Sequence, residues 1–203
     1  MKSLFIVFDG LDGSGKGEMI KRLKAYLSKK DKNIKILVTK EPTDGQYGRQ
    51  IRDILRKEKD PRHGAELCLS LFVKDRKEHL AEEIEPFLKK GGIVICDRYY
   101  YSTIVFQQTQ GIDIEKILLS NISFRTPDIA FILDLPAKTA LERIHKRGSA
   151  KEKFEQLGFM KDLRDNFLNL DKKLGDNIKV IDASKGKEEV FKQIQSEIEV
   201  ILK

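Results

Sequence analysis

The amino-acid sequence predicts an α/β protein built on a five-stranded parallel sheet with helices on both faces. Five short runs rich in β-branched residues recur along the chain, and segments with helical periodicity lie between them. Most of these runs are apolar at nearly every position, which is typical of strands covered on both faces. The alternation of strands and helices favours a parallel sheet. The length of 203 residues predicts one domain, residues 1–203, that buries a substantial core.

The predicted strands are residues 4–9, 34–38, 93–96, 129–134 and 178–181. Between the second and third strands, residues 65–88 predict one long helix, because Leu67 and Leu71 begin a series with helical spacing. We expect this helix to end near Pro86 or at Gly91-Gly92.

Charged residues directly follow four of the predicted strands. They are Asp9, the pair Lys40-Glu41, the pair Asp97-Arg98, and Asp134. In open parallel sheets, ligands bind at the carboxyl ends of the strands. The sequence therefore predicts one shared polar site at that edge of the sheet.

A glycine-rich turn joins the first strand to the helical segment that begins near Met19. The turn has the spacing Gly-x4-Gly-Lys, which is typical of a phosphate-binding P-loop, where backbone N–H groups and a lysine hold nucleotide phosphates. The usual Ser or Thr after the lysine, whose hydroxyl ligates Mg²⁺, is replaced by glycine. The candidate nucleotide-binding residues are Gly10, Leu11, Asp12, Gly13, Ser14, Gly15, Lys16 and Gly17.

The composition excludes several classes of function. The net charge of +7 is spread over lysines interleaved with glutamates, without an arginine-rich arm or an aromatic-basic RNA-binding motif. We therefore expect no nucleic-acid partner, and the positive charge suits phosphorylated small molecules. No apolar run approaches the length of a membrane span, and residues 4–8 lack the features of a signal peptide. With only two cysteines, Cys68 and Cys96, the expected compartment is the cytoplasm.

A basic segment with a Gly-Ser break lies between two helical stretches at residues 143–153. It is either a solvated turn or a lid, at about residues 143–155, that brings arginines onto transferring phosphates.

The sequence resembles the thymidylate kinases, which are P-loop nucleoside monophosphate kinases. The resemblance extends over nearly the whole chain and is carried by FDGLDGSGK at 8–16, KEPTDG at 40–45, LFVKDRKEH at 71–79, DRYYYST at 97–103, PD at 127–128, LDLP at 133–136 and FE at 154–155. It implies a three-layer P-loop NTPase fold with a small basic lid. It also implies transfer of a phosphoryl group from ATP to dTMP with Mg²⁺, giving dTDP for dTTP synthesis, by an enzyme that is usually a homodimer.

The resemblance also implies roles for individual residues. The residue matching Phe72 stacks on thymine, those matching Arg76 and Arg98 contact the base and phosphate, and that matching Asp12 lies near the sugar 3′-hydroxyl. The complete substrate-binding set is Asp12, Glu41, Arg52, Phe72, Arg76, Arg98, Thr103 and Phe106, with Gln107 as a weaker candidate. Lys16, Asp12, Arg98 and Arg147 are the catalytic candidates, Arg143 would lie near the adenine, and Asp9 or Asp97 would anchor Mg²⁺. Gly13 and Ser14 stand where some members carry a P-loop arginine, so the lid is expected to supply it.

Two alternatives remain open at the level of sequence. One is a related kinase with another or broader acceptor, such as dUMP or dGMP. The other is a nucleotide-binding regulator with weak turnover, which the missing hydroxyl at Gly17 motivates.

Overall fold

The computed structural model describes residues 3–58, 60, 62–146 and 154–202. The strands are β1 (Leu4–Gly10), β2 (Ile36–Lys40), β3 (Ile93–Asp97), β4 (Ile129–Asp134) and β5 (Ile178–Asp182). The helices are α1 (Lys16–Lys30), α2 (Gln46–Lys57), α3 (Ala65–His79), α4 (Glu85–Lys89), α5 (Tyr100–Thr109), α6 (Ile114–Asn121), α7 (Ala137–Lys146), α8 (Leu157–Leu168) and α9 (Lys187–Ile201). A π-helical turn, Leu80–Ile84, connects α3 to α4.

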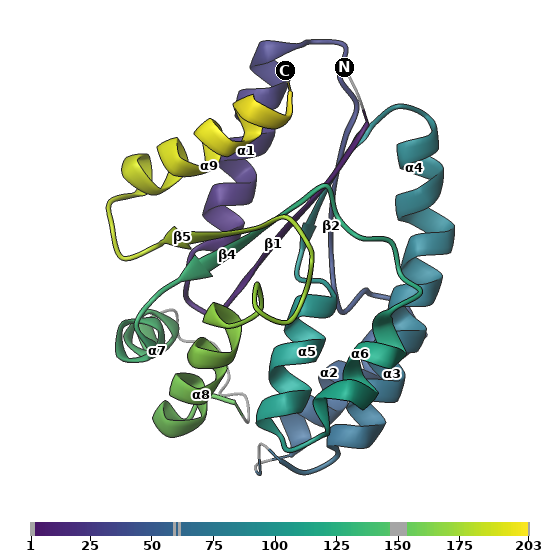
Figure 1. The fold of residues 1–203 in the computed structure, drawn as a ribbon, viewed down its shortest axis with the longest axis vertical. Helices are drawn as coiled ribbons and strands as arrows, with labels where there is room; N and C mark the ends of the chain where they lie inside the picture. Colours follow the sequence, from purple (N-terminus) through teal and green to yellow (C-terminus); the bar gives the residue numbers. More distant parts are fainter. Residues whose placement is uncertain (1–2, 59, 61, 147–153, 203) are drawn as a thin grey trace.

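The five strands form one parallel sheet in the order β2-β3-β1-β4-β5. Helices α1 and α9 cover one face, whereas α4, α5 and α8 lie on the other (Figure 1). The predicted α/β architecture is therefore confirmed. The chain lays β2 and β3 on one side of β1, and β4 and β5 on the other, so the strand order switches direction at β1. Ligands of open α/β sheets bind beside such a switch point.

The predicted strands are all present, but only β4 has the predicted bounds at both ends. Strands β1, β3 and β5 each end one residue later than predicted, and β2 ends two residues later. Strand β2 also begins two residues later than expected, because the N–H of Ile34 donates to the carbonyl of Asp31 in a turn. The predicted long helix is continuous from Ala65 to Lys89, but the π-helical turn interrupts its hydrogen-bond pattern. Pro86 follows this turn at the start of α4, where its missing N–H is tolerated. The turn itself was not predicted.

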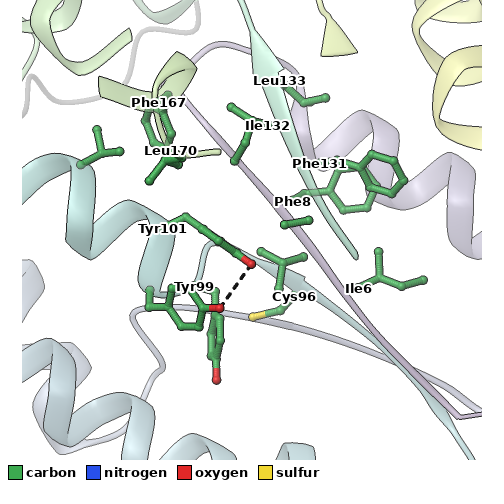
Figure 2. Close-up of a cluster of buried hydrophobic side chains, with 14 of the residues drawn as sticks. Ile6, Phe8, Cys96, Tyr99, Tyr101, Phe131, Ile132, Leu133, Phe167 and Leu170 are labelled. Atoms are coloured by element: carbon green, nitrogen blue, oxygen red, sulfur yellow. Dashed lines mark hydrogen bonds between the residues drawn. The ribbon is translucent and has the colours of Figure 1, made fainter. Parts of the chain in front are cut away.

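The core lies on both sides of β1, which is buried at all seven positions. The rings of Phe8 and Phe131, from β1 and β4, lie 5.1 Å apart, and Figure 2 shows them with the surrounding apolar side chains. Burying a side chain of this kind contributes about 1.5–3 kcal/mol. The central strands therefore give the loops at their carboxyl ends a rigid base.

Both cysteines, Cys68 and Cys96, are buried and free. The Cys96 thiol donates to the carbonyl of Arg98 across 3.0 Å. In the part of the chain that the structure describes, no helix combines the length and apolarity that crossing a membrane requires.

Candidate functional site

The glycine-rich turn forms a loop between β1 and α1 that surrounds an open anion site. Gly10, Gly13 and Gly15 have φ angles of 128°, 81° and 100°, which L side chains rarely adopt. Lys16 begins α1, and its ammonium group donates to the carbonyls of Gly10 and Leu11 at 3.3 and 3.1 Å. Burial, aided by the charge of Arg98, lowers the pKa of Lys16. The loop N–H groups, the helix N-terminus and Lys16 thus favour a phosphate.

Helix α7 packs directly against this loop. A Cβ at Gly13 would lie 2.6 Å from the carbonyl oxygen of Ala140, and the guanidinium of Arg143 donates to the Gly13 carbonyl at 3.4 Å. A cleft of about 460 Å³ opens beside the loop and includes Lys185 and Lys187 in its wall. These two lysines follow β5 and were not predicted. The rule that charged residues at strand ends mark the site would have found them if applied to the fifth strand as well.

A second cavity, of about 250 Å³, lies at the carboxyl ends of β1, β2 and β3. Seven of the eight predicted substrate-binding residues line it, together with Gln107. Thr103 is the exception, because its buried hydroxyl faces the Arg76 guanidinium at 2.9 Å. The wall consists of Asp12, Lys40, Glu41, Pro42, Arg52, Leu55, Phe72, Arg76, Arg98, Tyr99, Ser102, Phe106, Gln107 and Phe154.

Arg76 is fully buried, and its guanidinium is fixed by polar partners from three elements. It donates to a Glu41 oxygen through Nε at 2.9 Å, to Asn121 at 2.6 Å and to Thr103 at 2.9 Å. It also lies over the ring of Tyr99, 5.0 Å from the centroid. A buried charge this fully paired has few accessible orientations. The contributions of Asn121 and Tyr99 were not predicted, because the sequence does not show which distant residues reach a buried arginine.

Arg98 occupies a strained backbone position, with φ of 71°. Its N–H donates to the Phe8 carbonyl of β1 at 2.8 Å, so the residue is fixed to the central strand. Its guanidinium donates to Ser102 at 2.7 Å and to Asp12 at 2.8 Å. Arg98 therefore joins the end of β3 to the phosphate loop.

The carboxylate of Asp9 is completely buried between the loop and α5. It accepts hydrogen bonds from the N–H groups of Gly10, Tyr99 and Ser102 and from the Ser102 hydroxyl, at 2.6–3.2 Å. Burial raises its pKa, while Arg98 and the Ser102 hydroxyl act in the opposite direction. Both oxygens are thus engaged by donors from within the protein.

Asp97 differs from Asp9 in having a carboxylate oxygen without a hydrogen-bond partner among the described residues. Its Oδ1 atom is buried and accepts no hydrogen bond from any residue that the structure describes. Asp97 and Gly17 line the same cleft, of about 660 Å³, and a Cβ at Gly17 would have no neighbour within 4 Å. The described residues contain no group of three or more potential metal ligands. A single carboxylate beside open space fits Mg²⁺, which keeps several waters when it binds with a nucleotide.

Of two further predicted arginines, Arg52 lies in the described part of the chain and Arg147 does not. Arg52 lines the cavity at the ends of β1–β3, donates to the Pro42 carbonyl at 3.0 Å and pairs with Asp44 at 3.0 Å. Arg147 and most of the predicted lid lie outside the described residues.

The family model described as thymidylate kinase matches residues 8–194. The chain belongs to the thymidylate kinase family. It is 39% identical over 173 residues to a probable thymidylate kinase of Pyrococcus horikoshii, covering 84% of this chain and 83% of the relative. It is 36% identical over 197 residues to a probable thymidylate kinase of Pyrococcus abyssi, covering 96% and 95%. A thymidylate kinase of Desulfotalea psychrophila is 40% identical over 152 residues, covering 74% and 73%. The chain is thus a nucleoside monophosphate kinase, a phosphotransferase.

Replacing Gly13 by alanine should disable the phosphate loop of this kinase. The added methyl group would be strained at a φ of 81° and would collide with the Ala140 carbonyl, so the loop must shift. We expect Gly13→Ala to weaken ATP binding by at least about tenfold, equivalent to about 1.4 kcal/mol, as measured by titration calorimetry.

Gly17→Ala is the matched control. Its methyl group enters open space within α1, where alanine is favoured over glycine by about 1 kcal/mol. ATP affinity should stay close to that of the parent protein. Equal affinities for the parent and Gly13→Ala would contradict the importance of the close approach between the loop and α7.

Proposed function

We propose that this kinase transfers the γ-phosphoryl group of ATP directly to the phosphate of dTMP, giving dTDP and ADP. The observation that carries this proposal is the placement of Arg98. Its backbone is bonded to β1, from which the phosphate loop extends, while its guanidinium lines the second cavity. A donor phosphate on the loop and an acceptor phosphate at Arg98 would therefore lie beside each other, and phosphoryl transfer depends chiefly on such positioning and charge neutralisation.

On the donor side, the loop N–H groups and Lys16 would hold the phosphates of ATP. Lys16 would neutralise charge on the transferring group, and Arg143, at the cleft beside the loop, would lie near the adenosine part. Ser14 supports this arrangement, because it lines the same cleft and its buried hydroxyl has no hydrogen-bond partner among the described residues. Arg147 remains our candidate for the arginine that reaches the transferring phosphate.

On the acceptor side, Phe72 would stack on thymine, and Arg76 and Gln107 would contact the edge of the base. Gln107 is 1% exposed, and its Nε2 donates to Gln110 at 2.9 Å, whereas its Oε1 has no partner among the described residues. A free carbonyl oxygen suits the N3–H group of thymine. Asp12 would lie near the sugar, and Arg52 and Arg98 would hold the phosphate.

When bound, Mg²⁺ would supply charge neutralisation at the donor phosphates. Asp97 would hold it, directly or through water, because Asp97 lines the cleft that includes Gly17 and its Oδ1 has no hydrogen-bond partner among the described residues. We favour Asp97 over Asp9, since the Asp9 oxygens already accept several hydrogen bonds.

A panel of nucleoside monophosphates tests the acceptor assignment through release of ADP. We expect kcat/KM to be highest with dTMP, lower with dUMP, and at least about a hundredfold lower with dCMP. Cytosine has no N3–H group for the Gln107 oxygen, and a buried polar group left unpaired discriminates strongly. Turnover of dGMP or dUMP with dTMP inert would refute the assignment. Tight binding of ATP and dTMP without transfer would instead indicate a regulator.

Restoring the missing hydroxyl should strengthen Mg²⁺ use. We expect Gly17→Thr to raise kcat. It should also lower the Mg²⁺ concentration that gives half the maximal rate by about tenfold, because the hydroxyl adds one ligand bond to the ion. Gly17→Ala separates the effect of the hydroxyl from that of helix stability, since it adds only a methyl group. No difference between the threonine and alanine variants in Mg²⁺ dependence would contradict the idea.

We further propose a homodimer formed through α3 and α6. Leu67 on α3 and Leu119 and Ile122 at the end of α6 are 55%, 69% and 79% exposed. The two helices lie side by side, joined by the pair Lys116–Glu66 at 2.7 Å. Large apolar side chains exposed on neighbouring helices favour an interface there.

Sedimentation measures this association. The parent protein should sediment as a dimer, and Ile122→Lys should shift it to the monomer. Val200→Lys, on α9, adds the same charge at another exposed apolar position and should leave the dimer intact. A monomeric parent protein would overturn the proposal.

The cytoplasm is the compartment we propose for this enzyme. Two buried, free cysteines suit a reducing environment. ATP and dTMP are the small-molecule partners that we propose for the site.

A further inference from the structure

His79 lies at the end of α3, outside the wall of the acceptor cavity, and the mechanism above gives it no role. It is 4% exposed, and the π-helical turn begins at the next residue. Turns of this kind are rare and are frequently found at functional sites.

Both ring nitrogens of His79 face acceptors. Nδ1 lies 3.1 Å from Glu41 Oε1, and Nε2 lies 3.0 Å from Glu83 Oε2 and 2.8 Å from the Thr39 hydroxyl oxygen. The Thr39 hydroxyl donates its proton to Glu83 at 2.7 Å, so its oxygen is available to accept. Only the doubly protonated imidazolium donates at both nitrogens.

The other oxygen of Glu41 holds Arg76. Oε2 accepts from Nε and Nη2 of Arg76 at 2.9 and 2.8 Å, and the side chains of Glu41, Arg76 and His79 are each at most 2% exposed. Each carboxylate oxygen of Glu41 thus pairs with a different side chain, Oε2 with Arg76 and Oε1 with His79. With Glu83, whose side chain is 47% exposed, the cluster contains two carboxylates and two cations, so it is neutral while His79 is protonated.

We propose that His79 is a positioning residue for the acceptor: as an imidazolium, it holds Glu41 in the orientation that fixes Arg76 against the base of dTMP. This inference rests on the assignment of Arg76 to the base pocket in the proposed function. His79 touches neither substrate and acts only through Glu41.

The groups that face the imidazole come from three elements. They are Glu41 from the loop after β2, Thr39 from β2 and Glu83 from the π-helical turn. Burial alone would lower the pKa of His79, but the hydrogen bond and charge of Glu41, followed by those of Glu83, outweigh burial and raise the pKa above its ordinary value. Cys96 and Tyr99 lie near Glu41, and burial raises the pKa of both, which keeps them neutral.

Because the pKa of His79 is raised in the folded protein, the stabilisation by its imidazolium depends on pH. The stabilisation by His79 is complete below the ordinary histidine value of about 6.5 and is lost as the pH rises through the higher pKa of the folded state. Once the proton leaves, the imidazole keeps a single N–H group and no longer attracts Glu41 as a cation. The cluster then carries one excess negative charge. Arg76 loses its fixed position, and the KM for dTMP should rise on this alkaline side.

Steady-state kinetics from pH 6 to 9 test the proposal. In the parent enzyme, the KM for dTMP should rise across the pKa of His79, with little change in kcat. His79→Gln cannot carry a charge, so we expect a KM about tenfold higher at pH 6 and no further rise across that window. Glu83→Gln keeps the imidazole but removes one of its carboxylate partners, so the midpoint should move to lower pH. His63→Gln, at an exposed histidine, should retain the parent profile.

Ring-nitrogen NMR provides a readout that does not depend on turnover. The chain has three histidines, and of these His79 is the buried one, so its signals are assignable by exclusion from the spectra of His63→Gln and His145→Gln. We expect both ring nitrogens to be protonated at pH 6.5. A neutral imidazole at that pH would overturn the proposal, even if His79→Gln failed to fold.

The KM values of Arg76→Lys and His79→Gln for dTMP test the base pocket and the role of His79 separately. If Arg76→Lys leaves the KM for dTMP unchanged, the assignment of the base pocket is wrong. If Arg76→Lys raises that KM while His79→Gln retains both the parent KM and its pH dependence, the pocket stands and the role of His79 is refuted.

Discussion

The buried carboxylate of Asp9 is the interaction on which the site depends. It lies at the end of the central strand and accepts hydrogen bonds from the start of the phosphate loop and from the backbone of Tyr99 and Ser102 at the start of α5. An anion at the N-terminus of a helix is favoured by the helix dipole. Burying this charge is costly, as the raised pKa of Asp9 shows, and the surrounding donors compensate for that cost. The result is a fixed junction between the loop, α5 and Arg98.

Around this junction, the polar residues of the site are arranged in layers. Arg98 contacts Asp12 and Ser102 directly beside the loop, and Arg76 is fixed farther out by Glu41, Thr103 and Asn121. Each arginine has carboxylate and hydroxyl partners, which hold its planar guanidinium in one orientation. A site that binds phosphates and a flat base needs cations whose direction is set before the substrate arrives, because rigid placement lowers the cost of binding.

Much of this organisation could be predicted from the sequence. The strands and the phosphate loop follow from local patterns, namely apolar runs and the spacing of glycines with Lys16. The resemblance to a family selected Phe72, Arg76 and Arg98, which do line one cavity. Local patterns do not show which distant side chains complete a buried network. Asn121 reaches Arg76 from 45 positions away, and the π-helical turn after His79 leaves no periodic signal in five residues. The free oxygen of Asp97 depends on the packing of several elements and has no counterpart in the sequence either.

The hydrogen bond from the Arg98 N–H to the Phe8 carbonyl also determines a length scale. Strands β1 and β3 are neighbours, so the glycine-rich loop and Arg98 leave the sheet about 4.8 Å apart. That separation is a constant of sheet geometry and does not vary with the sequence of the surrounding loops. The loops around the site can therefore differ in length or sequence without changing the spacing of the two strands from which the glycine-rich loop and Arg98 extend.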